Sequence, residues 1–254
     1  GVIQRIARDN VPHPVQVAYP AAGEEYWRRL RHASAFADTE VIVPRPVSGD
    51  EARLPAGPLT LTARPLSHPI PSYGYRIEEP PGRTMLPAEL ARRGIHGPMI
   101  GELQRKGSIT APDGSVVTLE ECSVPRPGQS FAFVMDTRLC DAAFALADGV
   151  DLLVVEATFL SAEASLAAHY GHLTAAQAGR LAAACGVRRL VLTHFSERYP
   201  VAEEWRFREE AGKAFSGEII LARDLARIPV PKRRRERDAR PGDRPAGEPP
   251  ASHG

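Results

Sequence analysis

Acidic and imidazole side chains follow apolar runs in the second half of this 254-residue chain. Asp136, Glu156 and His194 each come directly after a run that is typical of a buried strand, and His172 stands just before a helix start. In layered α/β proteins, ligands and metals bind at the rim where strands give way to helices. We therefore expect these four side chains to meet at one site.

Imidazole and carboxylate groups together could bind a metal or move a proton. A fifth candidate, His68, follows an alternating strand-like segment. Zinc prefers imidazole and carboxylate ligands, and a histidine oriented by a carboxylate can transfer a proton. Each residue also has an ordinary interpretation: Asp136 could cap a helix, Glu156 could favour a helix dipole, and His68 and His194 could be a loop and a core histidine.

The surrounding segments predict alternating strands and helices, which favours α/β layering. The helix that begins at Thr174 has a capping box with Gln177 and ends before Gly186. Expected strands cover 14–19, 41–43, 59–66, 73–79, 131–135, 151–155, 189–193 and 218–222, and expected helices cover 1–9, 22–36, 87–93, 141–147, 174–186 and 201–215. The Gly- and Pro-rich stretch 83–128 is less regular and predicts a hairpin at Asp113-Gly114.

Composition limits the classes of protein that the chain can represent. The 43% apolar content fits a globular core, and no apolar run approaches the length of a membrane span. The net charge of +1 is uneven, because residues 226–254 carry +4 and the rest carries −3. The body is therefore no globally basic nucleic-acid binder. Three cysteines without a C-x-x-C pair favour a reduced, cytosolic setting, and 232–254 is expected to be a disordered Arg/Pro-rich tail.

Several of these segments carry a resemblance to a known family. The quoted motifs are Asp-Thr at 136–137, VEATFL at 155–160, GHLT at 171–174 and LTHFSERY at 192–199, together with His68 followed by Ser72 and Gly-Tyr-Arg at 74–76. Over about residues 1–231 the chain resembles ribonuclease Z, the tRNA 3′-processing endonuclease of the metallo-β-lactamase superfamily. The implied fold is a metallo-β-lactamase-like αββα sandwich of four layers, with residues 1–231 as its partial domain.

One motif of the family is absent. Its members open their metal site with an H-x-H-x-D-H box on an N-terminal loop, and this chain has no such box. We therefore expect an N-terminally truncated member that lacks the first strands and the first metal-binding box, and that is incomplete for catalysis.

The resemblance also implies a role for each candidate residue of the site. His68, Asp136 and His194 would be ligands of two zinc ions, with Asp136 bridging them. Glu156 and His172 would transfer a proton to the leaving 3′ oxygen. Arg198 and Tyr199 would contact the substrate, since a guanidinium binds phosphate through a bidentate fork.

The insertion at about 83–128 corresponds to the tRNA-binding arm of the family, with Gly97, Pro98, Arg105 and Lys106 as contacts. Its alternative is a solvated excursion without a partner. The implied function is a zinc-dependent, cytoplasmic and homodimeric endoribonuclease without membrane association. It would remove the 3′ trailer from precursor tRNA and leave a 3′-hydroxyl. The alternatives are a non-catalytic truncated product or tRNA-binding remnant, and a small-phosphodiester hydrolase of the same fold.

Overall fold

A computed structural model describes residues 1–38 and 40–233 of the chain, so most of the expected tail lies outside the described residues. The chain divides into two compact units. The first combines Gly1–Glu78 with Ser130–Pro231, and the second contains Glu79–Gln129 and the segment from Lys232 onward. Each unit is described by itself.

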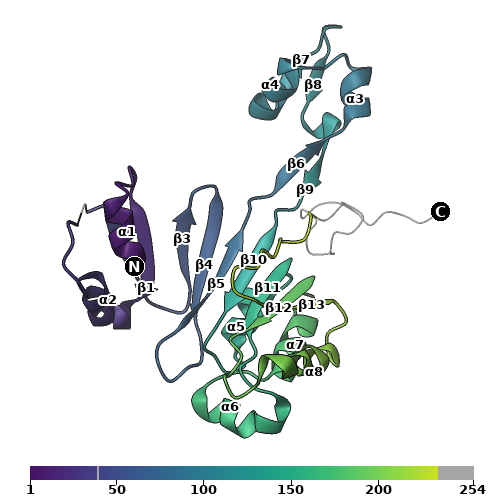
Figure 1. Cartoon of the computed structure of the whole chain (residues 1–254). Helices are drawn as coiled ribbons and strands as arrows, with labels where there is room; N and C mark the ends of the chain where they lie inside the picture. The colour runs from purple at the N-terminus through teal and green to yellow at the C-terminus, as the bar shows by residue number, and fades with distance from the viewer. Residues whose placement is uncertain (39, 234–254) are drawn as a thin grey trace. The chain divides into compact units, whose positions relative to one another are not determined.

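A seven-stranded sheet forms the frame of the first unit, in the order β13-β12-β11-β10-β5-β4-β3 (Figure 1). Four neighbouring strands run parallel: β10 (Ser130–Val134), β11 (Leu152–Glu156), β12 (Arg189–Thr193) and β13 (Glu218–Leu221). The antiparallel remainder consists of β5 (Tyr73–Glu78), β4 (Leu59–Pro65) and β3 (Ala52–Ala56). The carboxyl ends of β10, β11 and β12 therefore meet at one edge of the sheet.

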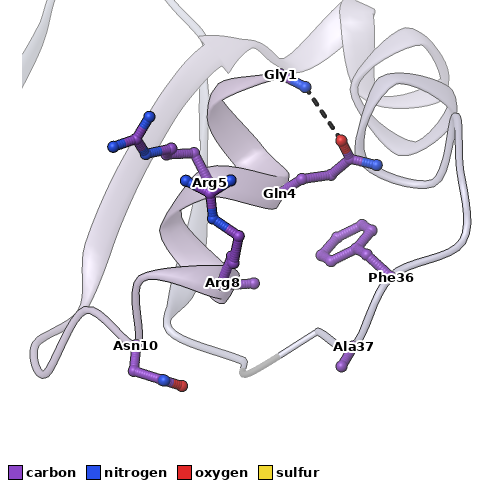
Figure 2. Close-up of a pocket in the computed structure, with 8 residues that line it drawn as sticks. Gly1, Gln4, Arg5, Arg8, Asn10, Phe36 and Ala37 are labelled. Atoms are coloured by element: carbon purple, nitrogen blue, oxygen red, sulfur yellow. Dashed lines mark hydrogen bonds between the residues drawn. The ribbon is translucent and has the colours of Figure 1, made fainter.

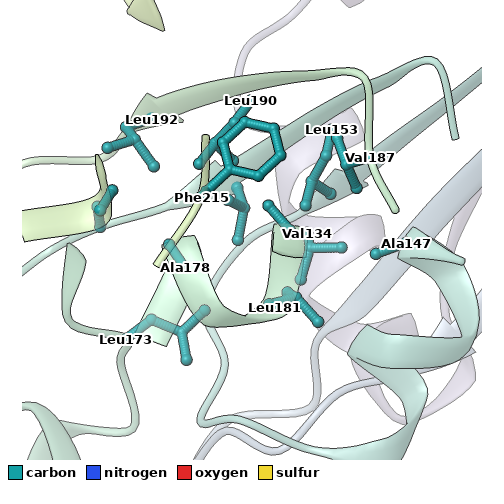
Figure 3. Packing of buried hydrophobic residues seen from close by; sticks show 14 of the residues in the cluster. Val134, Ala147, Leu153, Leu173, Ala178, Leu181, Val187, Leu190, Leu192 and Phe215 are labelled. Atoms are coloured by element: carbon teal, nitrogen blue, oxygen red, sulfur yellow. The ribbon is translucent and has the colours of Figure 1, made fainter. Parts of the chain in front are cut away.

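Helices connect the parallel strands and bury their apolar side chains. These helices are α5 (Asp141–Ala147), α6 (Ala164–Tyr170), α7 (Ala175–Ala184) and α8 (Trp205–Gly212). Leu153 and Leu190 from the sheet pack with Leu181 of α7 in a core in which all three are fully buried (Figure 3). Helix α7 begins as the sequence predicted, because Thr174 and Gln177 form the reciprocal hydrogen bonds of a capping box.

The N-terminal part of the first unit is a small parallel strand pair with two helices. It contains α1 (Val2–Arg8), β1 (Val15–Pro20), α2 (Glu24–Arg31) and β2 (Ile42–Val47). Tyr19 of β1 stacks on Trp27 of α2 with ring centroids 5.3 Å apart. The helix predicted over 22–36 is shorter than expected and is preceded by a 3-10 turn at Ala21–Gly23.

The second unit has a core of its own, built around the buried side chains of Leu90, Ile95 and Leu103. Its elements are β6 (Gly82–Met85) paired with β9 (Ser123–Arg126), α3 (Pro87–Arg92), α4 (Pro98–Lys106), and the hairpin of β7 (Ser108–Thr110) and β8 (Val116–Thr118). The sequence predicted α3 and the hairpin and missed α4, which begins at Pro98 directly after Gly97 and contains Gly101. No helix in the described part of the chain is long and apolar enough to cross a membrane.

Candidate active site

The end of each central parallel strand presents one of the predicted residues. Asp136 follows β10, Glu156 is the last residue of β11, and His194 follows β12. Since these three strands are direct neighbours, the side chains converge as the sequence predicted. Oδ1 of Asp136 lies 3.6 Å from Nε2 of His194 and 3.9 Å from Nδ1 of His172.

Glu156 is the buried centre of the site, with no exposed side-chain surface. Its carboxylate accepts hydrogen bonds from the backbone N–H groups of Thr137 (2.6 Å) and Leu173 (3.0 Å) and from the hydroxyl of Thr158 (2.6 Å). Nδ1 of His172 lies 3.0 Å from the same carboxylate. Because a buried carboxylate needs such donors, this environment holds Glu156 as an orienting acceptor.

His172 lies between the other two histidines of the site. Its ring centroid is 5.3 Å from that of His68 and 5.3 Å from that of His194. With Nδ1–H directed to Glu156, its Nε2 is the ring atom that remains available for chemistry. The pair can therefore work as a proton donor or acceptor whose orientation is set by the carboxylate.

The loop that carries His68 is held against the loop after β10. The backbone N–H of Ser67 donates to the Thr137 hydroxyl (3.1 Å), and Arg138 N–H donates to the Ser67 carbonyl (2.8 Å). The Ser72 hydroxyl donates to the Asp136 carbonyl at 2.8 Å. These bonds bring His68 beside Asp136 although 68 positions separate them in the chain.

Two groups of side chains within the described residues could hold a metal ion. In one, ligand atoms of His68, Asp136 and His172 lie within 4.8 Å of one another, and in the other those of Glu156, His172 and His194 do so. Both oxygens of Glu156 already accept hydrogen bonds, so Glu156 is poorly suited to be a ligand. The better donors are therefore imidazole nitrogens and the half-exposed carboxylate of Asp136.

The contact between His194 and Asp136 tests whether a cation fits. The Thr158 hydroxyl donates to Glu156, so at 2.9 Å it can only accept from Nδ1–H of His194. Nε2 then presents a lone pair to the carboxylate of Asp136, 3.6 Å away. Two facing lone pairs at that distance suit two ligands that each lie about 2.0–2.2 Å from one zinc ion. The donor set thus fits part of a zinc site.

Arg198 and Tyr199, the two residues predicted to contact substrate, have different surroundings in the structure. Arg198 is exposed, and its guanidinium forms no ion pair within the described residues. The Tyr199 hydroxyl accepts from Leu160 N–H at 3.0 Å and donates to Glu163, while its ring packs edge-on against Phe207. Burial is the main cause that raises the pKa of Tyr199, and the hydrogen bond to Glu163 also raises it. Through these contacts, Tyr199 stabilises its loop. A contact between Tyr199 and substrate stays a prediction.

The remaining predicted residues lie in the second unit. Gly97 precedes α4 with a φ of 55°, a left-handed conformation that glycine adopts easily, and Pro98 is the first residue of the helix. Arg105 and Lys106 occupy its last turn, where Lys106 pairs with Glu102 at 2.7 Å. Positive side chains at this helix end also complement the helix dipole.

A pocket of about 610 Å³ lies away from these residues, in the N-terminal part of the first unit. Figure 2 shows Gln4, Arg5 and Phe36 among its lining residues. It contains none of the predicted site residues, so its size says nothing about the chemistry at the ends of the strands.

Three polar residues of the site were not assigned a role from the sequence. The N–H of Thr137 donates to Glu156, and its hydroxyl accepts from the N–H of Ser67. The Ser72 hydroxyl donates to the Asp136 carbonyl, and the Thr158 hydroxyl joins Glu156 to His194. All three lie inside the segments that carry the resemblance, but their contacts join residues 2 to 70 positions apart, and most of these separations are too long for spacing alone to reveal. Their hydroxyl groups within otherwise apolar surroundings were the available signal.

Comparison with known proteins identifies the family of the chain. Residues 112–195 match the family model described as a beta-lactamase superfamily domain. The chain is 61% identical over 237 residues to a ribonuclease Z of Thermobifida fusca, which covers 93% of this chain and 74% of the relative. It is 56% identical over 235 residues to a ribonuclease Z of Nocardia farcinica, which covers 92% of this chain and 76% of the relative.

Solved structures agree on the fold. Human tRNase Z, short form, matches with a TM-score of 0.54 at 19% identity, over 91% of this chain and 73% of that one. A metallo-beta-lactamase fold protein of Bacillus subtilis matches with a TM-score of 0.56 at 21% identity, over 87% and 67% of the two chains. The predicted metallo-β-lactamase-like fold class is thereby confirmed.

Proposed function

Because this chain belongs to the ribonuclease Z family of the metallo-β-lactamase superfamily, we propose that it acts in tRNA 3′-end maturation as a hydrolase, an endoribonuclease that removes the 3′ trailer from precursor tRNA. The observation that carries this proposal is the buried Glu156 with His172 directed at it, beside Asp136 and His194. The family predicted from the sequence is confirmed by these relatives.

The chemistry follows from the groups at the strand ends. His68, Asp136 and His194 would hold zinc, which when bound supplies a Lewis acid that activates water and neutralises phosphate charge. In the proposed hydrolysis, the water oxygen forms a bond to phosphorus and the bond from phosphorus to the 3′ oxygen breaks. Glu156 would stabilise the imidazolium form of His172 through Nδ1–H, and that ring would give its Nε2 proton to the leaving oxygen and become neutral. The proton that the attacking water loses would pass to solvent, from which His172 would be protonated again. The tRNA product then ends in a 3′-hydroxyl.

Substrate recognition is proposed to involve both units. The exposed guanidinium of Arg198 is suited to a phosphate group of the RNA. The second unit, as the arm, would contact tRNA through Gly97, Pro98, Arg105 and Lys106, because basic side chains on an exposed helix end bind phosphates without reading sequence. A homodimer in the cytoplasm remains part of the proposal.

Cleavage of precursor tRNA by the 254-residue chain with added ZnCl₂ tests the function directly. A product that ends in a 3′-hydroxyl, with turnover lost in His172→Ala and kept in His169→Ala, would support the proposal and overturn the expectation that this chain is incomplete for catalysis. His169 is a matched control because it is an exposed histidine three positions upstream, on α6.

The same preparation separates the alternatives. Cleavage of bis(p-nitrophenyl) phosphate with no action on precursor tRNA would favour a small-phosphodiester hydrolase. Binding of precursor tRNA without cleavage of either substrate, with zinc present, would favour the non-catalytic alternative.

A further inference from the structure

A single hydroxyl group joins the proton-transfer pair to a proposed zinc ligand. Thr158 Oγ1 lies 2.6 Å from Oε2 of Glu156 and 2.9 Å from Nδ1 of His194. Thr158 is buried, with 7% of its surface exposed, so water competes little for these bonds. Its carbonyl also accepts from Ser196 N–H at 3.1 Å, which ties the loop of His194 to the loop after β11.

The direction of the two hydrogen bonds follows from the number of protons. A threonine hydroxyl has one proton to donate. Glu156 has no proton to offer in this contact because its oxygens already accept from backbone N–H groups, so Thr158 donates to it. The oxygen of Thr158 must then accept, and His194 is the donor through Nδ1–H. The neutral imidazole of His194 is thereby held in one of its two tautomers.

We propose that Thr158 is a positioning residue that holds His194 in the Nδ1–H tautomer and so presents the Nε2 lone pair to the metal site. This inference rests on the proposed function for its purpose, although the tautomer itself is a property of the chain alone. Partners of the second ring nitrogen orient metal-binding histidines and raise their basicity. Here the partner is a hydroxyl that is fixed in turn by the buried carboxylate of Glu156.

The left-handed backbone of His194 makes such a fixed partner important. With a φ of 61°, its backbone is in a region that residues other than glycine rarely adopt. The ring is half exposed, so surrounding side chains do not lock it. Without the Thr158 oxygen, the ring could rotate or take the Nε2–H tautomer, which presents a proton instead of a lone pair to Asp136.

Thr158→Val and Thr158→Ser test the role of the hydroxyl. Valine keeps the shape and removes the hydroxyl, whereas serine keeps the hydroxyl. The first readout is the tautomer of His194 in the metal-free chain, taken from long-range ¹H–¹⁵N spectra at a pH where the ring is neutral. The second is Zn²⁺ affinity, measured by competition with a chromogenic chelator. We expect Thr158→Val to lose the Nδ1–H tautomer and to bind Zn²⁺ roughly 10- to 100-fold more weakly, and Thr158→Ser to resemble the parent chain in both.

Thr62→Val is the matched control, because Thr62 is another buried threonine but lies on β4, outside the site. It should change neither readout. The proposal is overturned if Thr158→Val keeps the Nδ1–H tautomer, or if Thr158→Ser loses the tautomer as fully as Thr158→Val. A parent chain with the Nδ1–H tautomer but no cleavage of precursor tRNA would instead count against the proposed function and leave the role of Thr158 intact.

Discussion

Asp136 and His194 follow two strands of the parallel sheet in the same left-handed backbone conformation, with φ values of 53° and 61°, and their atoms Oδ1 and Nε2 lie 3.6 Å apart. A left-handed conformation costs an L-residue roughly 1–2 kcal/mol, because Cβ approaches the carbonyl oxygen. Strain of this kind gathers at functional sites, where the surrounding structure holds it in place. At both positions, it turns a side chain from the end of a strand toward the shared site.

This strain predicts that glycine at position 136 destabilises the chain less than alanine does, which reverses the usual order of the two residues. Asp136→Gly should be more stable than Asp136→Ala by about 1 kcal/mol, because glycine takes a positive φ without steric cost. Both variants should lose Zn²⁺ affinity equally, since both lack the carboxylate. Urea unfolding followed by circular dichroism measures the difference in stability.

Asp148 provides the control for that comparison. It follows α5 with a φ of −55°, so Asp148→Gly should be less stable than Asp148→Ala. Equal stability of the two Asp136 variants would mean that the left-handed conformation carries no cost in this loop.

The buried carboxylate predicts a large loss of stability in Glu156→Gln. The amide keeps the shape but replaces one acceptor oxygen with an NH₂ donor, which would face the N–H and O–H groups that now donate to Glu156. Leaving buried donors unsatisfied costs about 1–3 kcal/mol, so the free energy of unfolding should fall by that amount. Urea unfolding again provides the measurement.

Glu120→Gln is the matched control, because the Glu120 side chain is largely exposed. We expect it to change stability by less than about 0.5 kcal/mol. A Glu156→Gln protein as stable as the Glu120→Gln protein would show that the carboxylate is not the shared acceptor seen in the structure.

Local patterns predicted the parts of the fold that depend on near neighbours. The apolar runs of β10, β11 and β12 and the capping box at Thr174 each encode an element within a few residues. The convergence of Asp136, Glu156 and His194 followed from strand order in layered α/β folds. The ligand roles came from the resemblance, because spacing alone is also compatible with helix caps and core histidines.

Other features depend on contacts that sequence spacing does not reveal. The strand pair β6–β9 joins residues about 40 positions apart, and its short segments have no clear alternation. Helix α4 contains a glycine and begins at Pro98, directly after Gly97, and glycine and proline usually mark turns. The link through Thr158 requires two loops to meet, so only the folded structure places its hydroxyl between Glu156 and His194.

The buried thiol of Cys185 predicts a loss of stability at alkaline pH. Burial, as the main cause, and the negative charge of Asp148 together raise its pKa from 9.0 to about 11. The neutral thiol is favoured in the folded chain, so this contribution is complete below about pH 9 and is lost as the pH rises from 9 through 11. Two pKa units correspond to at most about 3 kcal/mol.

Urea unfolding of the parent chain and of Cys185→Ala at pH 8 to 11 isolates this contribution. Other groups titrate in the same window, so the informative quantity is the difference between the two proteins, which should shrink as the pH rises. Cys140→Ala, at a half-buried thiol, serves as the comparison. A difference for Cys185→Ala that stays constant with pH would contradict the shifted pKa.

The basic end of α4 predicts a change in how tRNA binding depends on salt. Arg105 is exposed in the last turn of the helix, beside Lys106, which is already paired with Glu102. A phosphate contact displaces condensed counterions from the RNA, so removing one contact weakens binding and flattens its salt dependence. For Arg105→Ala, the slope of log K against log salt concentration for precursor tRNA should fall in magnitude by about 1.

The control is Arg53→Ala, which removes an exposed arginine on β3 in the first unit and should leave the slope unchanged. Filter binding between 50 and 200 mM KCl, roughly the range over which such contacts dominate, distinguishes the two outcomes. If Arg105→Ala, Arg53→Ala and the parent chain gave equal slopes, the second unit would be the solvated excursion without a partner. Loss of an arginine that contacts phosphate must reduce counterion release and therefore change the slope.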